Sequence, residues 1–227
     1  MTRGRNEIAR DMRYWILFTG CLLLAIDGHA APAPTSQPAG NARMGFTITG
    51  KVTAASEVPL SEMVVFLEHD GSPPPEAVQP ALPTVQVSQK GAKFAPALTI
   101  VSVGQTVDFL NDEDRPVEHN VFSNAPAKKF DLGLYPPQLH KSVTFDKPGA
   151  VLLYCSIHRF MDGVVYVCPT RYHSRVAEDG TYRIENVPPG KYKLRTWQRR
   201  KRFPEKTEPL ELSGAGERTV NLELRRS

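Results

Sequence analysis

Short hydrophobic runs, most of them alternating with polar residues, recur along the middle of the chain. The runs begin at Val85, Phe94, Leu98, Val107, Val121, Val143, Val151 and Val164. A period of two is typical of β-strands that bury one face, and the glycines and prolines between the runs are typical of turns. The pattern predicts about eight short strands in a Greek-key β-sandwich and no helix of any length.

Further strands are expected on both sides of this region. Phe46 to Val52 alternates in the same way, and Met63 to Leu67 is continuously apolar. The proline-rich segment 71–80 breaks regular structure. Beyond residue 172 we expect a hairpin, at 179–184 and 187–194, and two more strands, at 210–212 and 220–224. The predicted fold class is therefore all-β.

The first residues are typical of an export signal. A basic stretch ends at Arg13, an apolar run follows from Tyr14 to Ile26, and small residues suited to a peptidase follow at Ala30-Ala31. The run falls short of the roughly 20 residues that span a bilayer, so a retained membrane anchor is the lesser alternative. We expect residues 1–30 to be a signal peptide, 31–44 to be a flexible tether, and the mature protein to be periplasmic or otherwise exported.

Composition limits the number of domains and argues against nucleic acid as a partner. The chain has 227 residues, 41% of them hydrophobic, which suits one large or two small globular domains. Its formal charge of +4 is too small to favour nucleic-acid binding. Membrane association is not expected.

The candidate chemistry lies between two of the expected strands. Cys155, His158 and Met161 follow C-x2-H-x2-M spacing and offer a thiolate, an imidazole and a thioether. A blue-copper site takes two imidazoles and a thiolate in a plane with a long axial thioether. His119 is the expected fourth donor. A disulfide between Cys155 and Cys168 is the alternative in an exported protein.

This order of donors resembles the cupredoxin family, in its plastocyanin-like and amicyanin-like forms. The stretches Phe122-Ser123 and 130–135 also resemble plastocyanin-like proteins described as methylamine-utilisation proteins. The resemblance implies one copper ion, alternating between Cu(I) and Cu(II), in a domain at 83–169. It also implies that the Asn120 backbone N–H bonds the thiolate sulfur and that the Asn111 side chain ties the ligand loops together.

A second resemblance concerns the chain on either side. The phrase D-G-x-Y-x-I-x-x-V-P-P-G-x-Y-x-L at 179–194 is similar to carboxypeptidase regulatory-like (transthyretin-like) β-sandwiches. Strands that such a domain usually has at its start occur instead before residue 70. We therefore expect the copper domain to be inserted into a small β-sandwich made from 45–80 and 172–227.

These features favour an exported type 1 copper protein that carries single electrons and is not itself a catalyst. Electrons should pass through His158, beside Ile157 and Phe160, to a redox partner such as a periplasmic dehydrogenase or cytochrome c. A copper-storage protein and a non-redox interaction module are the alternatives. The chain lacks the additional histidine clusters that a multicopper oxidase or copper nitrite reductase needs.

Several residues have no part in this interpretation. Cys168 is expected to be a free buried thiol, and His69, His140 and His173 to be surface imidazoles. Trp197 is expected to pack in the small sandwich. The run Arg199–Arg202 is expected to be a solvated loop, with docking to an acidic partner or an anionic membrane surface as the alternative.

Overall fold

The computed structural model describes residues 45–54, 59–71 and 81–225. The expected signal peptide, its cleavage site and the tether lie outside these residues. Within them the chain forms strands, turns and one 3-10 turn, η1 (Leu60–Glu62), with no α-helix, so the all-β prediction is confirmed. None of the described segments is a helix of the length and apolarity needed to cross a membrane.

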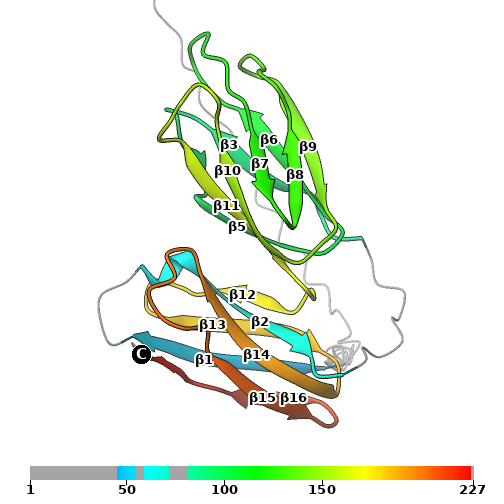
Figure 1. Ribbon diagram of the computed structural model, residues 1–227. Coiled ribbons are helices and arrows are strands. Elements are labelled where there is room, and N and C mark those ends of the chain that lie inside the picture. Colours follow the sequence, from blue (N-terminus) through cyan, green and yellow to red (C-terminus); the bar gives the residue numbers. More distant parts are fainter. Residues whose placement is uncertain (1–44, 55–58, 72–80, 226–227) are drawn as a thin grey trace, which may run out of the picture. The chain divides into compact units, whose positions relative to one another are not determined.

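The middle of the chain forms a β-sandwich, here called the central sandwich (Figure 1). One sheet has the order β5-β11-β10-β7-β8 and the other β4-β3-β6-β9. The strands are β3 (Val85–Gln89), β4 (Phe94–Ala95), β5 (Leu98–Ser102), β6 (Gln105–Asn111), β7 (Phe122–Ala125), β8 (Lys128–Asp131), β9 (His140–Phe145), β10 (Gly149–Tyr154) and β11 (Asp162–Cys168). Alternate residues of the two sheets, such as Val107, Phe109 and Val151, form the core between them.

The remaining strands form a second pair of sheets, the terminal sandwich. One sheet has the order β13-β1-β16, with β17 also paired to β1, and the other β12-β2-β14-β15. The strands are β1 (Phe46–Ala54), β2 (Met63–His69), β12 (His173–Arg175), β13 (Thr181–Val187), β14 (Gly190–Gln198), β15 (Thr207–Leu212), β16 (Gly216–Thr219) and β17 (Leu222–Leu224). Residues such as Ile48, Val65 and Leu194 fill its core. Its strands thus come from both sides of the central sandwich in the sequence.

Two strands depart from the alternating pattern, because both of their faces are buried. In β11, Val165 and Val167 face the core of the central sandwich, whereas Val164, Tyr166 and Cys168 belong to another apolar cluster. In β2, Val64 and Phe66 join that same cluster. Strands covered on both faces read as continuous apolar runs, which is what both sequences show.

This third cluster joins the two sandwiches. Trp197 of β14 lies in it, and its ring stacks on Tyr166 of β11 at 4.3 Å between centroids and 22° between planes. The expectation that Trp197 packs inside the small sandwich is wrong. Its side chain points to the outer face of β14, where the outer face of β11 covers it.

Candidate metal centre

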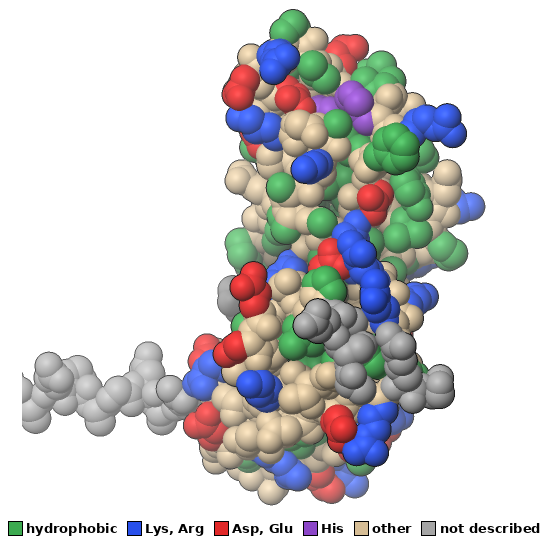
Figure 2. All heavy atoms as spheres, turned by 90° about the vertical axis from the view of Figure 1, so that its left-hand side faces the viewer, with side chains coloured by type: hydrophobic (Ala, Val, Ile, Leu, Met, Phe, Trp, Pro, Cys, Tyr) green, Lys and Arg blue, Asp and Glu red, His purple; other side chains and the backbone are tan. Residues whose placement is uncertain are grey.

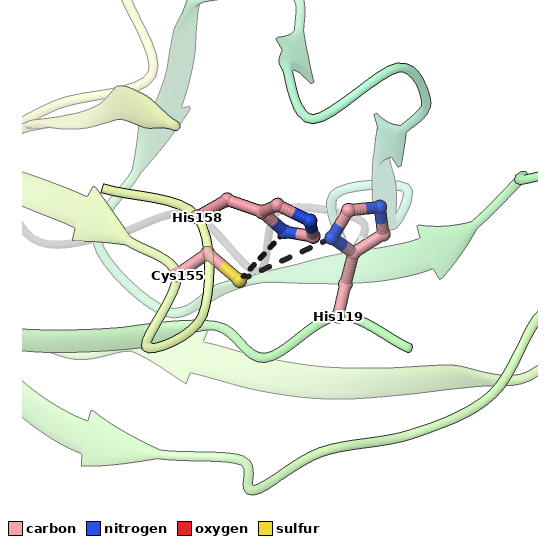
Figure 3. A group of neighbouring side chains, drawn as sticks. All are labelled: His119, Cys155 and His158. Atoms are coloured by element: carbon pink, nitrogen blue, oxygen red, sulfur yellow. Dashed lines mark hydrogen bonds between the residues drawn. The ribbon is translucent and has the colours of Figure 1, made fainter. Parts of the chain in front are cut away.

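Two separate stretches of the chain bring together three side chains that could bind a metal ion (Figure 3). His119 lies between β6 and β7, where its backbone bridges Tyr135 in antiparallel fashion. Cys155 directly follows β10, and His158 lies in the loop that leads to β11. The ligand atoms of the three residues all lie within 4.8 Å of one another.

The spacing of these donors suits a single metal ion. Cys155 Sγ lies 3.6 Å from His158 Nδ1 and 3.9 Å from His119 Nδ1. A first-row ion bonded at roughly 2.0–2.3 Å to imidazole and thiolate in a trigonal plane keeps its donors about 3.5–3.7 Å apart. The set of one thiolate and two imidazoles is also the donor set of a blue-copper plane. The two sulfur-to-nitrogen distances lie close to this spacing, and the donor chemistry fits copper.

A carboxylate fixes the tautomer of His119, whose side chain is fully buried. Glu113 Oε1 lies 2.9 Å from His119 Nε2. The hydrogen bond holds the pKa of the Glu113 carboxyl below its ordinary value. Because the carboxylate accepts the proton on Nε2, the lone pair of the neutral ring lies on Nδ1, the atom that faces Cys155. Sequence reasoning missed Glu113, which lies in the acidic run 112–114 and looks like part of a surface loop.

The two asparagines lie behind the donors. The Asn120 backbone N–H points at Cys155 Sγ at 3.5 Å, and its side-chain oxygen accepts the Ser156 N–H at 3.2 Å. Asn111 is fully buried and donates to the carbonyls of Val117 and Tyr135, at 3.0 and 2.9 Å. These contacts are where the proposed supporting roles require them, and the roles themselves stay predictions.

Met161 closes the loop that carries Cys155 and His158. Its side chain is 1% exposed and packs in the same cluster as Cys155. Its backbone N–H donates to the carbonyl of His158 at 3.0 Å, which tightens the loop into a turn. The loop connects Tyr154 to Asp162, and these two residues are the last pair between β10 and β11.

Two exposed apolar side chains lie beside the donors, in a loop that also exposes Ser156 and Arg159. Phe160 is 97% exposed and Ile157 is 50% exposed, whereas His158 between them in the loop is half-buried. Figure 2 shows histidine atoms reaching the surface with hydrophobic side chains nearby. Neighbouring exposed apolar side chains, more than a single one, are typical of interaction surfaces.

The other candidate residues lie away from this group. Cys155 and Cys168 are both free, so the disulfide alternative is wrong, and burial raises the pKa of the Cys168 thiol. His140 is exposed and bonds Asp108 at 2.8 Å. His69 is partly buried against Tyr192, and this burial lowers its pKa.

His173 and Arg199 differ from their predicted surroundings. His173 is not a surface imidazole: it lies 3.2 Å from Ser102 Oγ, and burial lowers its pKa to about 4. Arg199 is not solvated, because its side chain is 14% exposed and contacts both Glu62 and Asp162. The solvated-loop prediction holds better for Arg200, whose side chain is 56% exposed.

Comparisons with known proteins add a modest likeness. No family model and no curated protein matches the chain. Among solved structures it is similar to a purple cupredoxin from Nitrosopumilus maritimus, at 25% identity over 37% of this chain and 98% of that chain, with a TM-score of 0.33. An oxidised amicyanin mutant matches at 25% identity over 37% and 81%, with a TM-score of 0.34. A copper-containing nitrite reductase from Thermus scotoductus SA-01 matches at 22% identity over 52% and 28%, with a TM-score of 0.37. At scores this low, the assignment of a copper site rests on the donor set itself.

Proposed function

We propose that this chain is an exported type 1 copper protein that transfers single electrons between redox partners and is not itself a catalyst. The observation that carries the proposal is the convergence of the Cys155 sulfur and one ring nitrogen from each of two imidazoles within 4.8 Å, in a largely buried site. Bound copper would supply reversible one-electron chemistry there, between Cu(I) and Cu(II).

Each donor would act through a defined atom. Cys155 would bind as the thiolate, because a metal ion displaces the thiol proton. His119 would bind through Nδ1, with its other nitrogen bonded to Glu113. Met161 would be the fourth and weakest ligand, and its distance from the copper would help set the potential. Since His119 and Cys155 are already buried and hydrogen-bonded, little rearrangement would accompany a change of oxidation state.

The exposed apolar surface supports a place for electron exchange. His158 is the least buried of the three donors in the group, and Ile157 and Phe160 flank it in the loop. A small apolar patch of this kind suits brief docking, as in redox encounters. The partner would be a redox protein of the periplasm, such as a dehydrogenase or a cytochrome c.

The chain order supports a proposal about domain organisation. We propose that the central sandwich is an insertion in the terminal one. In the described structure, β1 pairs with β13 and β2 pairs with β14, so segments before and after the central sandwich share both sheets. The likeness of the terminal sandwich to regulatory-like domains stays a prediction.

Electron self-exchange between copies of the copper-loaded protein tests the proposed function. Phe160→Glu places a charge in the patch that two copies must bury against each other, so we expect exchange to slow by about tenfold or more. The visible spectrum should stay unchanged. Val103→Glu is the matched control, because Val103 is a 40% exposed hydrophobic residue that follows β5 and donates its N–H to Cys168, at the far end of β11. Equal slowing by both variants would contradict docking at Phe160, and a copper-binding protein without redox cycling would indicate storage.

A further inference from the structure

The ligand loop begins after one residue and ends before another, and these two residues face each other in the sheet. Cys155 directly follows Tyr154, and Met161 directly precedes Asp162. Tyr154 and Asp162 are the last paired residues of β10 and β11. Any displacement of Asp162 would therefore move the adjacent proposed ligand, Met161, and would change how the loop closes.

Asp162 is held from outside the central sandwich. Arg199, which follows β14 of the terminal sandwich, donates from Nη2 to Asp162 Oδ2. Its other terminal nitrogen, Nη1, donates to Glu62 Oε1 at 2.8 Å, and its backbone N–H donates to the Glu62 carbonyl at 3.1 Å. One guanidinium thus spans two carboxylates from different sandwiches, which its planar fork is suited to do.

Arg199 itself is held by its surroundings on the terminal-sandwich side of this contact. Its side chain is 14% exposed and that of Glu62 is 21% exposed, whereas the Asp162 side chain that it reaches is 61% exposed. Two residues before Arg199, Trp197 stacks on Tyr166, four residues along β11 from Asp162. The two contacts run along the same outer face of β11, because residues of a strand alternate between its faces.

We infer that Arg199 is a positioning residue for the ligand loop: by fixing Asp162, it sets the place of Met161 and so tunes the proposed copper site from the terminal sandwich. The inference rests on the proposed function where it concerns copper. The bracing of the loop can be tested separately in metal-free protein. Arg199, the first residue of the basic run Arg199–Arg202, would then have a structural role.

The first test is amide hydrogen exchange in the full-length metal-free protein. The amides of Ser156 and Met161 are hydrogen-bonded within the site and report on the loop. Arg199→Met and Asp162→Asn should each speed their exchange about fivefold, the factor expected for losing a well-placed ion pair. Arg200→Met is the matched control, because Arg200 bonds Glu62 and, within the described structure, does not bond Asp162, so it should leave exchange unchanged. Unchanged exchange in both test variants would overturn the inference.

The second test separates positioning from charge, using the copper-loaded protein. Arg199→Lys keeps the charge but loses the fork, so a purely Coulombic role predicts an unchanged potential. Positioning predicts that Arg199→Lys and Asp162→Asn both alter the visible band pattern. Both should also shift the Cu(II)/Cu(I) equilibrium up to about fivefold, or about 40 mV at 59 mV per decade.

The outcomes of this second test are distinct. A shift in Arg199→Met and an opposite shift in Asp162→Asn, with both spectra unchanged, would overturn positioning in favour of through-space charge. A wild-type protein that binds no copper would contradict the proposed function, and the exchange experiment would still decide whether Arg199 braces the loop.

Discussion

The two arms of the candidate site are supported in different ways. The His119 arm is held within its own sandwich, because Glu113 bonds the ring and the buried Asn111 side chain bonds two carbonyls. The backbone N–H of Asn120, the next residue, points at the Cys155 sulfur. The loop that carries Cys155, His158 and Met161 has exposed residues at its tip. Its far end is fixed by Asp162, which contacts the terminal sandwich through Arg199.

This difference separates two tasks that an electron carrier must combine. A donor arm that is fully hydrogen-bonded inside the protein keeps its geometry whichever oxidation state the metal has. A donor arm at the surface can meet a partner, but it needs support that does not cover it. Contacts made to β11, away from the tip of the loop, support the loop and leave its tip free to meet a partner.

The largest effect should come from Cys155→Ser. Copper should stabilise the wild type by about 4 kcal/mol when the free metal is a thousandfold above its dissociation constant, because it binds only the folded state. The variant lacks the thiolate and should lose most of that increment together with any blue colour, while its core stays folded. Thermal melting of both proteins with and without copper measures this. Equal stabilisation of both would show that Cys155 is not a ligand, and an unfolded metal-free wild type would mean that the site is not preorganised.

The next largest effect should come from weakening the contact between the terminal sandwich and β11, which leads from the ligand loop. Trp197→Ala should lower the free energy of unfolding of the metal-free protein by about 3 kcal/mol, because it empties a site in the cluster that covers β11. Urea unfolding measures the loss. Leu152→Ala, at a 46% exposed position on β10, is the control and should cost far less. If the two substitutions cost the same, the two sandwiches do not pack together as described.

A smaller effect is expected on the pH dependence of stability, through a histidine beside the contact between the two sandwiches. His173 bonds Ser102 of β5, the strand next to β11, and its folded-state pKa is about 4 instead of the ordinary 6.5. Between these values the unfolded chain binds more protons at this residue, so its contribution to stability is present above pH 6.5 and is lost as the pH falls toward 4. The loss should amount to roughly 2–3 kcal/mol.

Urea unfolding of metal-free wild type and His173→Gln across this pH range isolates the contribution of His173. Glutamine can still bond Ser102 but does not titrate, so the variant should decline less on acidification. Parallel declines in the two proteins would rule out the assigned protonation of His173.

The smallest change concerns the support of the His119 arm. Glu113→Ala should lower copper affinity about 10- to 100-fold, as expected when the partner of a ligating imidazole is removed. Competitive copper titration measures the change. Asp114→Ala removes a neighbouring charge whose side chain is 78% exposed and pairs with Lys90, so it should change affinity little. Equal losses in both variants would assign the effect to the charge of the loop and not to the His119 hydrogen bond.

Much of the fold followed from the period of the hydrophobic residues. Strands with one buried face, such as β6 and β9, alternate cleanly and were predicted. β8 and β16 carry few apolar residues, so periodicity gave no signal for them. The continuous runs Met63–Leu67 and Val164–Cys168 did carry a signal, because strands buried on both faces read this way. A run of apolar residues does not say which element covers its second face, so the contact between the sandwiches could not be predicted.

For the site, spacing found the donors but not their support. C-x2-H-x2-M within one loop keeps soft ligands close in any fold, so Cys155, His158 and Met161 could be proposed from the chain alone. Glu113 and Arg199 act through contacts made across the tertiary structure, and charged residues in polar runs usually lie in solvent. No local pattern distinguishes the carboxylates and guanidinium groups that the fold largely buries from those that stay in solvent.

The most direct test of the copper site is one pair of spectra of the purified full-length protein loaded with one equivalent of Cu(II). A thiolate from Cys155 in a plane with His119 and His158 predicts an intense blue absorption from sulfur-to-copper charge transfer, and narrow hyperfine splitting in electron paramagnetic resonance. Both should disappear on one-electron reduction and return on oxidation. A colourless protein with the wide splitting of ordinary cupric sites would contradict a type 1 centre, even if copper is bound.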